Sequence, residues 1–298
     1  MANPINPQIK RVLIQKILQA RARKKKVKLP RPGKMKYPKM IEMSYMRDLQ
    51  VISDALIKIV REMMYPKVKE LVEQASKLRP DSKTIRIDEY QTQLDNVVSG
   101  MNIAFSQKVN DSDIKAIALR NGKRVNDFNQ QEVKKSYEKV IGIDVFASEP
   151  WLNQEMNAFV SSNVKLIKTV PDEFFGRVEK IVSQGVRAGT LTEDIVNELE
   201  DKVEPWAESR LDFIARDQVS KFNGQLNMLR QTEIGVSSYT WETSQDERVR
   251  PSHEEKQGNV YQWDDPPADT GHPGEDYQCR SVAIPVIDDL LDQVDEEV

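Results

Sequence analysis

The sequence Ile234-Gly-Val-Ser-Ser-Tyr-Thr-Trp241 marks the point at which the pattern of apolar residues changes. Upstream of it, from about Pro205, apolar residues recur every three or four positions, which predicts a long helix that ends before Gly235. From Val236 onward, β-branched and aromatic residues predict a strand. A helical body followed by a small unit with strands is therefore expected.

Two further strands are predicted, at residues 258–263 and 279–286, with a Pro- and Gly-rich loop at 266–274 between them. About 50 residues make a thin core by themselves, so we expect this small unit to pack on the preceding long helix. The predicted fold class is mainly α with a small α+β C-terminal domain, in which a helical body precedes a short-stranded, loop-rich unit at 236–287.

A variable helical region is predicted at 42–150. Its apolar residues between Tyr45 and Met63 are spaced alternately by four and three, and Pro66 should kink or end that helix. A second helix is expected from Asp88, and Asn121-Gly122 is interpreted as a turn before a short helix at 130–141.

The helical part at 151–235 carries three boundary signals. Pro171 fits the first turn of a helix, and Gly189 fits the residue that follows a helix C-terminus. Thr190 and Glu193 have the spacing of a capping box. We therefore expect separate helices on either side of Pro171, and another beginning after Thr190.

Charge is strongly segregated along the 298 residues. Residues 1–41 hold thirteen Lys or Arg and no Asp or Glu, which leaves 31 basic against 47 acidic residues in the remainder. Prolines at 30, 32 and 38 favour an extended arm, and such a basic block attracts polyanions. Either the arm contacts nucleic acid or an acidic protein, or it is a solvated tail or folds against the acidic body. The DNA-contacting candidates are Arg21, Arg23, Lys24, Lys25, Lys26, Lys28 and Arg31.

The remaining composition excludes several classes of protein. No apolar run approaches the length of a membrane-spanning helix, and the N-terminus lacks the features of a secretory signal. The one cysteine, Cys279, rules out an internal disulfide framework, and only His253 and His272 are available for histidine chemistry. The acidic residues at 288–298 are interpreted as a frayed, solvated tail.

The C-terminal motifs are distinctive. They run from Trp241 through Asp-Glu-Arg-Val-Arg-Pro-Ser-His253, then Gly258-Asn-Val-Tyr261, and end with His272-Pro-Gly-Glu-Asp-Tyr-Gln-Cys-Arg280. Together with Ile214-Ala-Arg-Asp-Gln218 they resemble the phage Mu protein F-like family of minor head or head-morphogenesis proteins, over residues 150 to 287.

The resemblance implies a minor head protein of a tailed phage, a structural protein associated with the portal. The implied partners are the portal protein, the major capsid protein and packaged double-stranded DNA, with no membrane. The implied location is the interior of the virion head, and the host cytoplasm during assembly. Two alternatives stay open: a transient assembly factor absent from the mature virion, and a metal-dependent nuclease-like or toxin-like enzyme using Arg248, His253 and Glu254.

A polar network that orders a long loop is the structural interpretation of the motif. Arginine suits this work because its planar fork satisfies carboxylates and carbonyls together. Its predicted members are Asp246, Arg248, Arg250, His253, Asp276 and Arg280.

Zinc is the one cofactor considered, since no cofactor is otherwise expected. Several members of the resembled family carry cysteine pairs where this chain has Arg250 and His253, and Cys-Arg-Cys where it has Cys279-Arg-Ser281. Here His253, His272 and Cys279 could supply three ligands, with a carboxylate from Asp269, Glu275 or Asp276 as the fourth. Their spacing is not that of a standard zinc finger, so packing roles for these residues remain the alternative.

Overall fold

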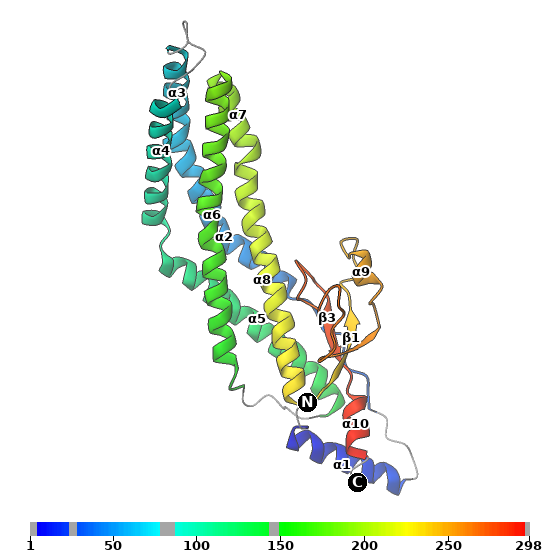
Figure 1. The fold of residues 1–298 in the computed structure, drawn as a ribbon. Coiled ribbons are helices and arrows are strands. Elements are labelled where there is room, and N and C mark those ends of the chain that lie inside the picture. The colour runs from blue at the N-terminus through cyan, green and yellow to red at the C-terminus, as the bar shows by residue number, and fades with distance from the viewer. Residues whose placement is uncertain (1–4, 24–28, 78–86, 143–148, 296–298) are drawn as a thin grey trace. The chain divides into compact units, whose positions relative to one another are not determined.

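A computed structural model describes residues 5–23, 29–77, 87–142 and 149–295. Most of this chain is helical, and a small sheet lies near its C-terminal end (Figure 1). The predicted fold class is thus confirmed. The helical elements are α1 (Pro7–Ala22), α2 (Lys39–Ile59), the π-helical η1 (Val60–Met64), α3 (Tyr65–Lys77), α4 (Ile87–Lys108), α5 (Asp111–Val140), α6 (Leu152–Ala188), α7 (Thr192–Lys202), α8 (Glu204–Glu233), α9 (Pro251–Glu254) and α10 (Asp288–Asp295). The strands are β1 (Ser238–Glu242), β2 (Val260–Gln262) and β3 (Val282–Pro285).

The chain divides into two compact units, each assembled from separate segments. Unit 1 comprises Met1–Glu42, Asn121–Phe159 and Arg216–Val298, and unit 2 comprises Met43–Arg120 and Val160–Ala215. The division after Glu42 lies next to the boundary predicted at residue 41, whereas the boundaries predicted at 150 and 235 fall inside stretches of unit 1. Helices α2, α5, α6 and α8 each contribute residues to both units.

In unit 2, the predicted apolar stripe of α2 is buried. Its members lie on one helix face because they recur at spacings of three and four. They include Tyr45, Leu49, Ile52, Leu56 and Ile59. The helical path then widens into η1, where the Tyr65 N–H donates to the Val60 carbonyl, and this π turn directly precedes Pro66. Pro66 lies in the first turn of α3, so the helical path does not end at this proline.

In unit 2, the helix boundary predicted at Pro171 is wrong, and those predicted at Gly189 and after Thr190 are confirmed, although the predicted capping box does not form. Helix α6 runs through Pro171 without ending, and Val170 and Phe174 on either side of the proline are fully buried. Helix α7 begins at Thr192 after Leu191, so Thr190 and Glu193 do not form the expected capping box. Gly189 follows the last residue of α6 with a φ of +72°, as expected for a helix C-terminus.

In unit 1, the turn predicted at Asn121-Gly122 is wrong, because both residues lie inside α5. A side chain larger than that of glycine would crowd its neighbours there. A Cβ atom at Gly122 would lie 2.8 Å from the Met156 sulfur and 2.8 Å from the Phe159 ring. The sequence signal thus reflects the close approach of α6 to α5 and not a change in chain direction.

The sheet is antiparallel, with the strand order β2-β1-β3. In its register, Tyr239 of the central strand pairs with Tyr261 on one side and with Pro285 on the other. All three predicted strand regions therefore contribute a strand, and residues 266–274 between β2 and β3 contain no helix or strand.

The small sheet packs on the C-terminal part of α8, as expected. Side-chain amides of Asn227 and Gln231 donate to the Ala283 carbonyl at 2.8 and 2.9 Å. The Trp263 indole N–H donates to Gln231 at 3.2 Å. Buried polar side chains of α8 thus satisfy groups on β3 and after β2, which fixes the sheet against the helix.

The two charged ends were predicted incorrectly. Residues 7–22 of the expected extended arm form α1, and residues 288–295 of the expected frayed tail form α10. Both helices have buried apolar stripes that pack in one hydrophobic core, which outweighs their charge. The stripe residues are Ile9, Leu13 and Ile17 in α1 and Leu290 and Val294 in α10. Residues 29–38, which contain the three prolines, form neither helix nor strand.

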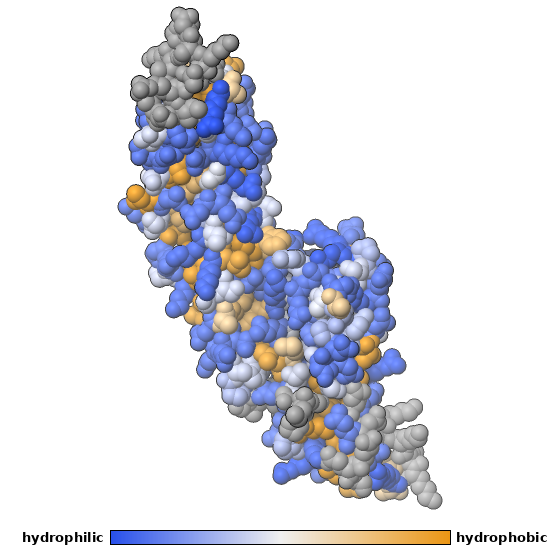
Figure 2. Space-filling model, viewed as in Figure 1, coloured by the Kyte–Doolittle hydropathy of each residue, from blue (hydrophilic) through white to orange (hydrophobic). Residues whose placement is uncertain are grey.

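Hydrophilic residues cover most of the face seen in Figure 2, with apolar residues in smaller groups between them. This agrees with the charged composition of 31%. No described helix combines the length and apolar content needed to cross a membrane.

Candidate functional site

One ion pair ties the loop after β1 to the start of the last strand. The Arg280 guanidinium donates to both Asp246 carboxylate oxygens, at 2.6 and 2.7 Å. Asp246 also accepts the Arg248 backbone N–H at 3.1 Å. Burial opposes ionisation of Asp246, but these bonds outweigh it and hold the pKa of that carboxyl below its ordinary value.

A second cluster is centred on His253, which is almost fully buried at the helix α9. Its Nε2 lies 3.0 Å from Asp276 Oδ2, and its Nδ1 lies 3.5 Å from Cys279 Sγ. The Arg250 guanidinium reaches the same Asp276 oxygen at 2.9 Å and donates to the Tyr277 carbonyl at 3.0 Å. The result is a chain of contacts from Cys279 through the imidazole to a carboxylate shared with Arg250.

Protonation in this cluster follows from its geometry. The hydrogen bond to Cys279 raises the pKa of His253 above its ordinary value. Burial disfavours the Cys279 thiolate, but the contact with His253 and the Gly274 N–H outweigh it, so the pKa of that thiol is lowered. Both shifts favour the charged forms of these two groups, whereas the Arg250 guanidinium, 3.1 Å from His253 Nε2, opposes positive charge on the ring.

Five predicted network members thus make the expected side-chain contacts, in two groups: Asp246 with Arg280, and Arg250, His253 and Asp276 together. Arg248 contributes its backbone N–H, and its side chain is exposed. The cluster suggested for a nuclease does not form a reaction centre of this kind. Both ring nitrogens of His253 are engaged, whereas Arg248 and Glu254 are exposed. A general base needs a free nitrogen facing a substrate.

The three zinc candidates do not converge on one point. His272 Nδ1 lies 2.9 Å from the Tyr239 hydroxyl, away from the contact between His253 and Cys279. Asp276 meets the opposite ring nitrogen of His253, so it cannot share a metal ion with Cys279 through that imidazole. In the part of the chain that the structure describes, no three His, Cys, Asp or Glu side chains are grouped as metal ligands.

The other two carboxylates considered for zinc have different partners. Asp269 accepts a hydrogen bond from the Lys256 ammonium at 2.7 Å, and Glu275 accepts one from the His272 backbone N–H at 2.7 Å. Each carboxylate therefore has a hydrogen-bonding role within the loops of unit 1.

Residues 176–284 match the family model described as phage Mu protein F like protein. This segment is similar to phage Mu protein F. The resemblance seen in the sequence is confirmed over these residues, which we call the F-like segment. The F-like segment contains both groups of the polar network, together with α7, α8 and the sheet.

An uncharacterized protein of Haemophilus influenzae is 40% identical to this chain over 163 residues. The aligned region covers 54% of this chain and 36% of the relative, so the chain spans about a third of that protein's length. No solved structure matches the chain.

Outside the F-like segment, the DNA-contacting candidates are only partly described. Arg21, Arg23 and Arg31 are exposed. The Arg21 guanidinium donates to the Asp295 carboxylate at 3.0 Å, so one arginine of the arm contacts the acidic α10. Contact between the arm and the acidic body was one of the alternatives left open by the charge pattern. The remaining candidates lie outside the described residues: Lys24, Lys25, Lys26 and Lys28.

Sequence reasoning missed a second polar centre on α8. Arg230 is fully buried and donates to Glu149 at 2.6 and 2.9 Å, and to side-chain oxygens of Asn126 and Asn129 at 2.6 Å each. The sequence does contain a signal for this centre. Three polar residues recur at helical spacing in a helix that we had recognised only from its apolar residues: Asn223, Asn227 and Arg230.

Proposed function

We propose that this chain is a minor head protein of a tailed phage that docks on the portal and capsid interior. The observation that carries the proposal is the match of residues 176–284 to the phage Mu protein F-like family. Its polar network supports a structural role, because its arginine side chains pair with carboxylates of the loops: Arg280 with Asp246, and Arg250 with Asp276.

Contact with packaged DNA through the basic arm is the second part of the proposal. Charge segregation supports it, because residues 1–41 carry no carboxylate side chain and Arg11, Arg21, Arg23 and Arg31 are exposed. Such contacts neutralise phosphates without reading bases, so binding should be independent of DNA sequence and weaken steeply with salt.

Binding to duplex DNA of random sequence, measured by fluorescence anisotropy at several salt concentrations, tests the arm. Replacing its seven candidate residues with glutamine should lower the salt slope, by about 0.9 for each phosphate that the arm no longer neutralises. A control variant replaces exposed lysines of unit 2 and should keep the slope: Lys67, Lys69, Lys115 and Lys202. An unchanged slope in the arm variant would contradict the DNA role.

Docking is tested by co-expression with the portal and major capsid proteins of the same phage, followed by purification and imaging of the complex. We expect the chain to co-purify with the portal ring and to be present in mature virions. Its absence from virions would favour the transient assembly factor instead. Failure to bind either component would overturn the docking proposal.

A further inference from the structure

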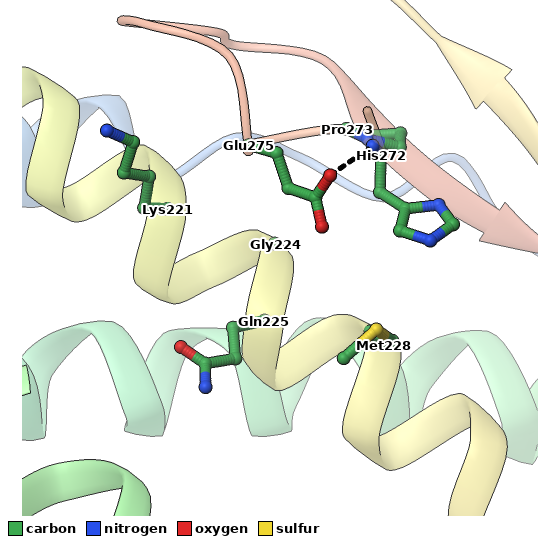
Figure 3. A pocket seen from close by; sticks show the side chains of 7 residues that line it. All are labelled: Lys221, Gly224, Gln225, Met228, His272, Pro273 and Glu275. Atoms are coloured by element: carbon green, nitrogen blue, oxygen red, sulfur yellow. Dashed lines mark hydrogen bonds between the residues drawn. The ribbon is translucent and has the colours of Figure 1, made fainter. Parts of the chain in front are cut away.

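A pocket of about 390 Å³ lies in unit 1 between α8 and the loop that contains His272 and Glu275 (Figure 3). One wall is the helix surface, and the other is the loop. The lining residues are Lys221, Gly224, Gln225, Met228, His272, Pro273 and Glu275. The polar network described above does not use this pocket.

The pocket is formed by tightly packed backbone. A Cβ atom at Gly224 would overlap the Pro273 carbonyl oxygen, so the loop lies directly on the helix because this position is glycine. The Ser220 hydroxyl of α8 donates to the Cys279 carbonyl, and Cys279 Sγ accepts the Gly274 N–H at 3.4 Å. These contacts hold the loop on α8 beside the pocket and preform its walls.

Charge within the pocket is unbalanced. The Lys221 ammonium is bound to Asp217 at 2.8 Å and lies 4.8 Å from the centre of the Tyr277 ring, so it is already neutralised. In the part of the chain described here, Glu275 belongs to no ion pair. One of its oxygens accepts the His272 N–H, and its carboxylate is directed toward α8 (Figure 3).

The remaining lining adds no positive charge. Burial lowers the pKa of His272, which leaves the ring neutral near pH 7. The Met228 side chain and Pro273 provide apolar surface on the two walls beside the carboxylate. The pocket thus combines one unpaired anion with a short apolar surface.

We infer that this pocket binds a primary ammonium group on an aliphatic chain, with the ammonium on Glu275 and the methylene groups against Met228 and Pro273. A lysine side chain of a partner protein and a free alkylamine share this chemistry. Because Glu275 is solvent-exposed, the ion pair should contribute modestly, about fivefold in affinity.

The full-length protein with ¹³C-methyl-labelled methionine tests the inference by NMR, with the Met228 signal assigned from a Met228→Leu variant. Titration with pentylammonium chloride should shift the Met228 methyl signal saturably in the millimolar range, and 1-pentanol should bind several-fold more weakly. The peptide Gly-Lys-Gly amide distinguishes the sources: saturable binding indicates a partner's lysine, and its failure where pentylammonium binds indicates a free amine.

Glu275→Gln is the decisive variant, since glutamine keeps an oxygen for the His272 N–H while removing the charge. It should weaken pentylammonium binding about fivefold. Glu254→Gln is the matched control, because it removes an exposed charge from the same unit outside the pocket and should leave binding unchanged. Equal binding of amine and alcohol, or equal loss in both variants, would overturn the inference.

Discussion

Arg230 and Glu149 form an ion pair that is almost completely removed from solvent: the Arg230 side chain is 0% exposed and that of Glu149 is 5% exposed. Two nitrogen atoms of the guanidinium donate to two carboxylate oxygens, and the remaining donors reach Asn126 and Asn129. The pair joins α8 to residues immediately before α6. Buried charges of this kind are tolerated only while every donor and acceptor is satisfied.

Replacing Arg230 with methionine should therefore strongly destabilise the protein, by about 3–5 kcal/mol, because Glu149 would remain buried without a cation. Urea unfolding followed by circular dichroism measures this. Arg210→Met is the control, since Arg210 and Glu173 form a more exposed pair whose loss should cost less than about 1 kcal/mol. Equal effects of the two variants would show that Arg230 is not energetically special.

The contacts of His253 predict a pH-dependent contribution to stability. The contribution of His253 is complete below about pH 6.5 and is lost as the pH rises through its raised folded-state pKa. That of Cys279 is complete above about pH 9 and is lost as the pH falls through its lowered folded-state pKa. The two contributions therefore change in opposite directions as the pH rises: that of His253 falls and that of Cys279 increases.

His253→Asn should thus lower the free energy of unfolding by about 1–3 kcal/mol below about pH 6.5, and by less as the pH rises through the folded-state pKa of His253. Urea unfolding over this pH range measures the difference. When Cys279 is replaced by alanine, the loss of unfolding free energy caused by His253→Asn should depend much less on pH in the basic range. A difference that is constant with pH in the natural sequence would contradict the proposed charge state.

Two helical glycines should respond in opposite directions to alanine. At Gly122 the added methyl group meets Met156 and Phe159, so we expect a loss of about 1–3 kcal/mol in unfolding free energy. At Gly176 in α6 nothing lies within 4 Å, so alanine should stabilise the protein by about 0.5–1 kcal/mol. Thermal unfolding of both variants measures the change in stability at each site. A change of the same sign at both sites would contradict this prediction.

Packing rather than charge should hold α1 against α10. Leu290→Ala should cost about 2–4 kcal/mol, because Leu290 is fully buried in the core that contains Ile9, Leu13 and Ile17. Arg21→Gln should cost less than about 1 kcal/mol, since its ion pair with Asp295 is half-exposed. Urea unfolding compares them, and a larger effect of Arg21→Gln would reverse this order.

Much of the fold was predictable because its signals are local. The change of periodicity at Gly235 depends only on neighbouring residues, as does the stripe from Tyr45 onward. In contrast, Asn121-Gly122 has the composition of a turn, and only Met156 and Phe159, more than thirty residues away in sequence, explain why glycine is there. Helices α1 and α10 likewise have many charged residues and only short apolar stripes. These stripes predict helices only once it is known that they pack against each other.

The site was predictable in its members but not in their arrangement. Asp246 and Arg280 were expected to belong to one polar network, and they form an ion pair. The sequence could not indicate that His253 presents opposite ring nitrogens to Cys279 and Asp276, or that His272 lies on Tyr239. Ring orientation depends on packing of distant elements, and that orientation decides between a metal site and a hydrogen-bonded cluster.

Because unit 1 is assembled from three separate stretches, the F-like segment does not coincide with a self-contained fold. A fragment limited to residues 176–284 would lack the cores that α1, α5 and α10 complete around Ile234, Val236 and Val282. Such an excised fragment should aggregate or bind hydrophobic dyes. Recombinant truncations of this protein should therefore retain both flanks.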